Sequence, residues 1–174
     1  MKKTVYRIAL LALIIIWGCT PIISKNVMDQ VDQTVSFTAT LENPSSYQEK
    51  MVLWGGEIIS TRNQKDGTLI EILQKSLQYG NRPDQGDDTG GRFLALYDGY
   101  LDSAVYAKGR QITVAGVIRG SRVRKLDEID YTYPLLAVEE IHLWTEITEE
   151  DHDHFFHHHP FHWGCCPYPY YYHW

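Results

Sequence analysis

The chain has 174 residues, of which 44% are apolar, and it carries 16 Lys and Arg against 22 Asp and Glu. This length suits one domain of roughly 100 to 150 residues with appendages, because two smaller cores would bury too little surface. The apolar fraction excludes a fully disordered chain. The first 18 residues hold three basic side chains and no acid, so 13 basic and 22 acidic residues remain and their balance is −9. A nucleic-acid binder is therefore not expected.

The N-terminus is predicted to be a signal peptide, residues 1–18. Its apolar run, 8–17, is too short for a transmembrane helix, which needs about 20 residues. The ending Ile16-Trp17-Gly18-Cys19 resembles a bacterial lipobox, with a branched aliphatic residue three positions before the Cys. Cys19 is thus the predicted lipid-attachment site, modified by the lipoprotein processing and sorting machinery. Thr20 stands where an Asp would hold an enterobacterial lipoprotein in the inner membrane, which favours delivery to the outer membrane.

The mature chain is predicted to contain a tether and one β domain. Residues 19–34 are polar and lack apolar periodicity, which indicates a lipidated tether. Residues 35–147 hold short β-type runs separated by turn signals such as Lys65-Asp66-Gly67 and Gly90-Gly91. The runs cover 35–41, 51–60, 68–73, 92–97, 111–119 and 135–144. No amphipathic helix of convincing length is visible, so we predict an all-β fold, a small OB-like antiparallel barrel.

Side-chain alternation assigns faces within two of these runs. One face is predicted to carry Ile112, Val114, Gly116 and Ile118. A second face, interrupted by Glu139, is predicted to carry Leu135, Ala137, Ile141 and Leu143. Gly55, Gly56 and Gly116 inside strand-like runs indicate bulges or bends. The charged segment 119–130, basic and then acidic, predicts an exposed hairpin or loop.

Five stretches of the chain resemble one known family. They read WGGEIIS, DGTLIEILQKSLQ, GRFLALYDGYLD, KGRQITVAGVIRG and YTYPLLAVEEIHLW. Together with Cys19, they resemble the Slp family of bacterial outer-membrane lipoproteins over most of residues 20–147. The resemblance implies an OB-like β domain on the outer membrane and an association with starvation or stationary-phase stress. It implies no catalytic residue, and only Cys19 carries over as a functional residue.

Residues 148–174 are predicted to be a flexible tail rich in His, Cys and aromatic side chains. Imidazole nitrogens and thiolates together suit Zn, Ni or Cu ions. The candidate ligands are His152, His154, His157, His158, His159, His162, Cys165, Cys166 and His173. The two adjacent cysteines lack the spacing of a closed structural zinc site, so a metal-free aromatic tail that lies on lipid headgroups remains an alternative.

Three functions are compatible with the sequence. No hydrolase elbow, zinc-protease helix or phosphate-binding glycine loop is present, so an enzyme is not expected. The leading hypothesis is a non-catalytic outer-membrane lipoprotein that faces the periplasm and has a structural or stress-related role in the envelope. One alternative is a metal-binding envelope protein that acts through its tail. The other is a periplasmic ligand-binding OB-like domain whose strand face holds a peptide or saccharide.

Overall fold

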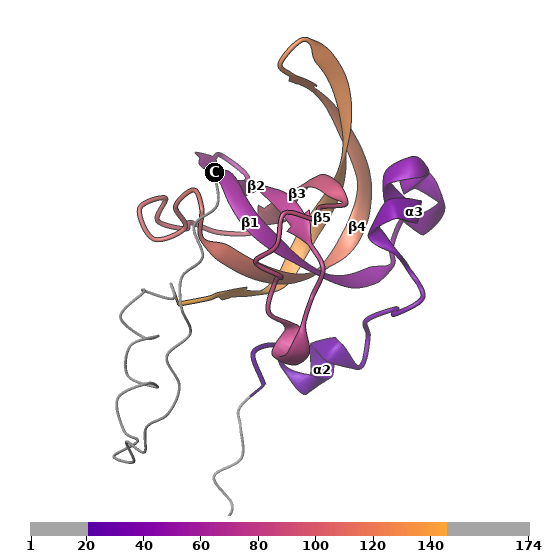
Figure 1. Ribbon diagram of the computed structural model, residues 1–174, viewed down its shortest axis with the longest axis vertical. Helices are drawn as coiled ribbons and strands as arrows, with labels where there is room; N and C mark the ends of the chain where they lie inside the picture. The colour runs from indigo at the N-terminus through magenta and orange to yellow at the C-terminus, as the bar shows by residue number, and fades with distance from the viewer. Residues whose placement is uncertain (1–20, 146–174) are drawn as a thin grey trace, which may run out of the picture.

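A computed structural model describes residues 21–145, and Figure 1 shows how their elements are arranged. The elements are α2 (Lys25–Met28), α3 (Phe37–Glu42), η1 (Pro44–Tyr47), β1 (Met51–Gln64), β2 (Gly67–Lys75), η2 (Tyr79–Asn81), β3 (Gly91–Tyr97), β4 (Gln111–Leu126) and β5 (Ile129–Leu143). The strands close into a barrel in the order β1-β2-β3-β5-β4. Every neighbouring pair is antiparallel except β3 and β5, which run parallel. This five-stranded closure confirms the predicted all-β, OB-like fold.

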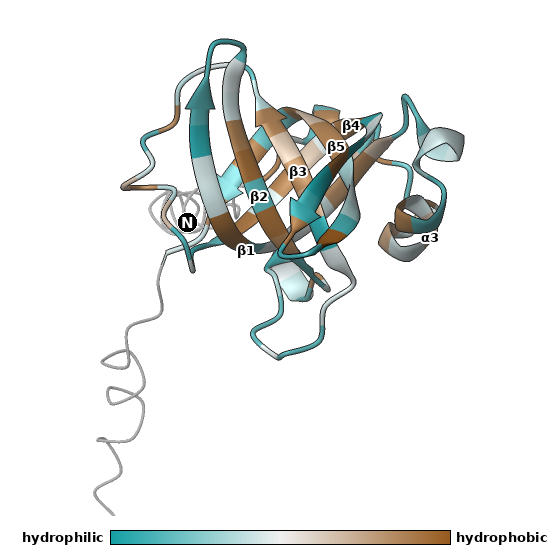
Figure 2. Ribbon diagram, turned by 90° about the horizontal axis from the view of Figure 1, so that it is seen from above, coloured by the Kyte–Doolittle hydropathy of each residue, from teal (hydrophilic) through white to brown (hydrophobic). Residues whose placement is uncertain are grey.

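Three aromatic rings from different elements meet in the core. Phe37 of α3, Trp54 of β1 and Phe93 of β3 contact one another edge to face, with ring centroids 4.9 to 5.9 Å apart. Phe93 is completely buried, and burial of such a side chain contributes about 1.5–3 kcal/mol. Apolar residues are concentrated on the strands in Figure 2. The helix before the barrel is therefore part of the same core as the strands.

The prediction of a strand at 35–41 is wrong, because this run contains most of helix α3. The Ser36 hydroxyl accepts a hydrogen bond from the Ala39 amide at 3.2 Å and caps the first turn of the helix. Phe37 and Thr40 are buried at helical spacing, one turn apart. Burial of Phe37 against the barrel outweighs the β preference of this short run.

Residues 21–34 pack on the barrel, so the predicted tether is wrong over this stretch. Ile23 is only 1% exposed. The Ser24 amide donates to Glu140 at 2.6 Å, and the Asp32 amide donates to the Met51 carbonyl at 2.8 Å. Ile23 is the one buried residue of 21–34, and a single buried position produces no periodicity, which is why the sequence pattern does not reveal this packing.

A bulge in β5 overturns one of the two predicted faces. Ala115 pairs with Glu140 whereas Gly116 pairs with Val138, so Glu139 is an extra residue in the ladder. The alternation therefore changes phase at Glu139. The β5 side chains that pack on the main core are Leu136, Val138, Ile141 and Leu143. Leu135 precedes the bulge, so its side chain lies on the opposite face from those of Ile141 and Leu143. It packs in a separate cluster with Leu94 and Tyr133.

The segment 119–130 forms the hairpin that extends from the barrel in Figure 1. Pairing of β4 with β1 reaches only Val117, and pairing of β5 with β3 begins at Leu135. Beyond these residues the two strands pair with each other alone up to their turn. Val123 and Ile129 near the tip are 64% and 60% exposed. The predicted exposed hairpin is confirmed.

Candidate functional site

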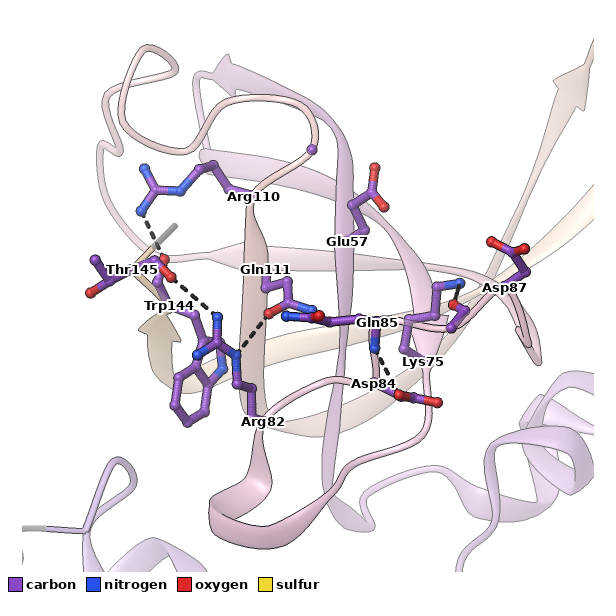
Figure 3. A pocket seen from close by; sticks show the side chains of 12 residues that line it. Glu57, Lys75, Arg82, Asp84, Gln85, Asp87, Arg110, Gln111, Trp144 and Thr145 are labelled. Atoms are coloured by element: carbon purple, nitrogen blue, oxygen red, sulfur yellow. Dashed lines mark hydrogen bonds between the residues drawn. The ribbon is translucent and has the colours of Figure 1, made fainter. Parts of the chain in front are cut away.

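A polar pocket of about 490 Å³ lies beside the loop that follows β2. Its walls come from strands β1, β2 and β4, from the loop residues 82–87 and from the end of β5 (Figure 3). The charged and aromatic side chains that line it are Glu57, Lys75, Arg82, Asp84, Asp87, Arg110 and Trp144. A volume of this size accommodates a small ligand, for which pockets of roughly 300–1,000 Å³ are usual.

Trp144 is held in place through its indole nitrogen. Nε1 donates to the Thr113 hydroxyl at 2.9 Å, and that hydroxyl donates to the Asn81 carbonyl at 2.7 Å. The ring of His142 meets the indole edge to face with centroids 4.7 Å apart, which confirms that the two share a strand face. Burial lowers the pKa of His142 below its usual value. The Arg82 guanidinium lies over the indole at 5.1 Å from the ring centroid, a favourable cation–π arrangement.

Arg82 is positioned by neutral groups. Its Nε donates to Gln111 Oε1 at 2.9 Å, and its Nη2 donates to the Thr145 carbonyl at 3.2 Å. The same Gln111 side chain donates to the Pro83 carbonyl at 3.1 Å. Within residues 21–145, no carboxylate forms an ion pair with Arg82. The guanidinium is therefore fixed in orientation without a carboxylate partner among the described residues.

Lys75 holds the loop against the sheet. The residue is only 7% exposed, and its ammonium donates to the Gly86 carbonyl at 2.6 Å. Buried lysines usually require a polar partner, because the ammonium loses its hydration. The carbonyl supplies that partner, so this contact fixes the loop that carries Asp84 and Asp87.

The remaining charges complete the pocket. Arg110 Nη2 donates to the Trp144 carbonyl at 2.8 Å, so Arg110 and Arg82 bond to adjacent residues, Trp144 and Thr145. Asp84 accepts hydrogen bonds from Gln78 Nε2 at 2.7 Å and from the Gln85 amide at 2.8 Å. In Figure 3 both arginines lie on one side of Gln111, and Lys75 and the aspartates lie on the other. The pocket thus has a guanidinium-rich end and a carboxylate-rich end.

A second hollow of about 440 Å³ lies between the N-terminal segment and the loop after β2. Met28 and Val31 line it together with Leu77 and Asn81, so α2 and η2 are close in space. Figure 1 shows both elements at the end of the barrel where the described chain begins. Tyr79 in η2 is fully exposed.

The predicted lipid site and metal ligands lie outside the described residues. Cys19 precedes them, and all the His and Cys candidates of the tail follow them. The assignment of Cys19 as the lipid site and Zn, Ni or Cu binding by the tail therefore stay predictions. Between residues 21 and 145, no group of three or more His, Cys, Asp or Glu side chains is placed to hold a metal.

Sequence reasoning missed the polar pocket. Arg82 and Trp144 belong to different elements and match no motif. The available signal is Lys75, a charged residue that closes the apolar run 68–73 and becomes almost completely buried. That signal does not identify its partners, because only the closed sheet brings the loop, β4 and β5 together.

Residues 16–174 match the outer membrane lipoprotein Slp family. The chain belongs to this family. Membership confirms the resemblance seen in the sequence and identifies the chain as an outer membrane lipoprotein, as predicted. The match includes Cys19 and the tail as well as the barrel.

Three relatives from two bacteria illustrate the similarity. "Outer membrane protein Slp" of Escherichia coli (strain K12) is 29% identical over 116 residues, which cover 67% of this chain and 61% of that protein. "Uncharacterized lipoprotein YeaY" of the same strain is 30% identical over 101 residues, 58% of this chain and 52% of that protein. An uncharacterized protein of Haemophilus influenzae is 31% identical over 104 residues, 59% of this chain and 56% of that protein. The chain thus spans 52% to 61% of the lengths of these relatives.

Two solved structures are similar to part of this chain at a low level. The small single-stranded DNA-binding protein from Streptomyces coelicolor has a TM-score of 0.35 and 15% identity, covering 55% of this chain and 94% of that chain. A putative aspartyl-tRNA synthetase from Leishmania major Friedlin has a TM-score of 0.38 and 15% identity, covering 68% of this chain and 23% of that chain. Similarity at this level indicates nothing about what this chain binds.

Proposed function

We propose that this Slp-family protein is a non-catalytic, lipid-anchored envelope protein whose barrel is held directly against the periplasmic face of the outer membrane. The observation that carries the proposal is the burial of Ile23, which is 1% exposed and follows the predicted lipid site Cys19 by four residues. Four extended residues span at most about 14 Å. If instead the whole stretch from Cys19 to residue 34 were an extended tether, it would span about 50 Å. The domain therefore has little freedom to leave the membrane surface.

The anchored end of the barrel has a surface suited to this position. The described chain begins beside α2 and η2, whereas the 119–130 hairpin extends to the opposite end in Figure 1. The Ser24 amide, bonded to Glu140 at 2.6 Å, ties the first residues to β5. Tyr79 is fully exposed at the anchored end. A tyrosine ring is well suited to the headgroup region, because its body is apolar and its hydroxyl is polar.

A structural role fits the chemistry that the described residues offer. Residues 21–145 contain one His and no Cys. The ring of that residue, His142, contacts Trp144. We assign it to packing and to no proton transfer, because a catalytic base must lie within hydrogen-bond reach of a reacting group. In the same part of the chain, no helix has the length and apolar character to cross a bilayer.

The family resemblance suggests when the protein acts. We propose that it supports the envelope during starvation or stationary phase, the conditions with which the resemblance associates it. Quantitative immunoblots across growth should show accumulation on entry into stationary phase. A strain that lacks the gene should lose envelope integrity in that phase, measured by dye uptake. Constant abundance and unchanged dye uptake would contradict the stress role.

Depth-dependent fluorescence quenching tests the position of the barrel. An environment-sensitive fluorophore is attached to Tyr79→Cys or, as a matched exposed site on the distal hairpin, to Ile129→Cys. Both variants also carry Cys165→Ser and Cys166→Ser, which leaves one reactive thiol once Cys19 is acylated. The lipidated protein is placed in phosphatidylethanolamine and phosphatidylglycerol vesicles that contain a headgroup-linked quencher.

We expect strong quenching at position 79 and little at position 129. The same proteins with Cys19→Ser should show little quenching at either position, because they lack the anchor. Equal quenching at both positions of the lipidated protein would refute a fixed orientation against the membrane. Mass spectrometry of the lipidated sample establishes separately whether acyl chains are present at Cys19.

A further inference from the structure

The polar pocket has opposite charges at its two ends. One end carries the guanidinium groups of Arg82 and Arg110, which donate to the carbonyls of Thr145 and Trp144, just after β5. The other end carries Lys75 with the aspartates of loop 82–87. Figure 3 separates the two groups across Gln111, and Glu57 also lies on the Lys75 side. Three cationic side chains and three carboxylates line the pocket, and this balance disfavours a ligand with a large net charge of either sign.

Arg82 has the geometry of a carboxylate receptor. Its Nε and one Nη2 proton are used by Gln111 and Thr145, and its face lies on Trp144. No group of the described residues accepts a hydrogen bond from Nη1. The donors that remain lie on the Nη1–Nη2 edge, which matches the two oxygens of a carboxylate. The present partners of Arg82 are neutral, and no carboxylate of residues 21–145 pairs with it. A ligand carboxylate would therefore meet no competing negative group from this part of the chain.

The opposite end suits a cationic group. Lys75 is already bonded to the Gly86 carbonyl, and no carboxylate of residues 21–145 pairs with its ammonium within 4 Å. Asp87 and Glu57 line the pocket, and their carboxylates accept no hydrogen bond from the described residues. Their oxygens are therefore available to accept hydrogen bonds from a ligand ammonium.

We infer that this pocket binds a small zwitterion of the short-peptide class, with its carboxylate at Arg82 and its ammonium group toward Glu57 and Asp87. The volume of about 490 Å³ suits a ligand of this size. The amides of Gln85 and Gln111 line the pocket between its ends and can bond the peptide group. The site is independent of the membrane orientation proposed above, since it uses residues of the barrel alone.

Calorimetric titration of alanyl-alanine into the mature chain carrying Cys19→Ser tests the inference. We expect saturable binding at millimolar concentration or below. N-acetyl-alanyl-alanine and alanyl-alanine amide should each bind at least about tenfold more weakly, because each lacks one charged group. Inorganic phosphate, a purely anionic probe, should bind more weakly than the dipeptide. Equal binding of the capped peptides, or no binding of the dipeptide, would overturn the inference.

Matched variants identify the residues. Arg82→Gln should weaken dipeptide binding at least about tenfold, whereas Arg82→Lys should restore part of it by keeping the charge without the two-donor edge. Asp87→Asn should weaken binding of the dipeptide but leave binding of its N-acetyl form unchanged. Arg62→Gln, on an exposed part of β1, is the control and should bind normally. Unchanged affinity in folded Arg82→Gln protein, with folding checked by its melting temperature, would also overturn the assignment.

Discussion

Replacement of Ile23 by Ala tests whether the N-terminal segment is part of the folded domain. Ile23 is 1% exposed, so the substitution removes buried methyl groups and leaves a cavity. Substitutions of this kind cost about 2–5 kcal/mol. For a folded unit of this size, 1 kcal/mol corresponds to roughly 3–5 °C in Tm, so Tm should fall by about 6 °C or more.

Urea and thermal unfolding of the mature chain measure the effect. Ile129→Ala is the matched control, since the same side chain is 60% exposed on the distal hairpin. An exposed substitution of this kind should change the free energy of unfolding by less than about 0.5 kcal/mol. If Ile23→Ala were as mild as Ile129→Ala, the segment would not be docked. The chain between Cys19 and the barrel would then be long enough for the barrel to move away from the membrane.

Three further outcomes are expected. Hydrogen bonds from the side chain of Thr34 and then from Lys50 lower the pKa of Asp32 from 3.8 to about 2. The stabilising contribution of the carboxylate is therefore present above pH 3.8 and is lost as the pH falls toward 2. Asp32→Asn should lower Tm at neutral pH and weaken the decrease of Tm in acid, and curves of Tm against pH that run parallel for the two proteins would contradict this. Gly56→Ala places a Cβ in a severe clash with the Leu73 carbonyl oxygen, so the β1–β2 pairing should break and circular dichroism should show loss of the folded state, whereas native spectra would refute the clash. Calorimetric titration of Zn, Ni and Cu into reduced mature protein should show binding that disappears when residues 151–174 are removed; no binding to either protein would refute a metal site in the tail.

Local patterns in the sequence predict most of the strands. The runs 51–60, 92–97 and 111–119 lie within β1, β3 and β4, because side-chain alternation depends only on neighbouring residues. Alternation fails at Glu139, where the bulge shifts the phase of β5. The cause of that shift lies in pairing with β4, which a one-dimensional pattern cannot reveal.

Long-range packing determines the elements that the sequence misassigns. Phe37 stands in a run with strand-like composition, yet it belongs to a helix because it packs on Trp54 and Phe93. Ile23 belongs to a polar stretch, and only its burial distinguishes a docked segment from a tether. In both cases the free energy comes from contacts far apart in the chain, and these override local propensity.

The sequence by itself determined the signal peptide prediction, the predicted lipid-attachment site at Cys19, the all-β class and the family resemblance. Each depends on composition or on the spacing of nearby residues. The tertiary structure decided where charged groups meet: Arg82 contacts Trp144 because strand pairing brings the loop after β2 next to β4 and to the residues that follow β5. The polar pocket is therefore a property of the closed barrel, since hydrogen bonds and electrostatic contacts depend on distance in space and not on separation along the chain.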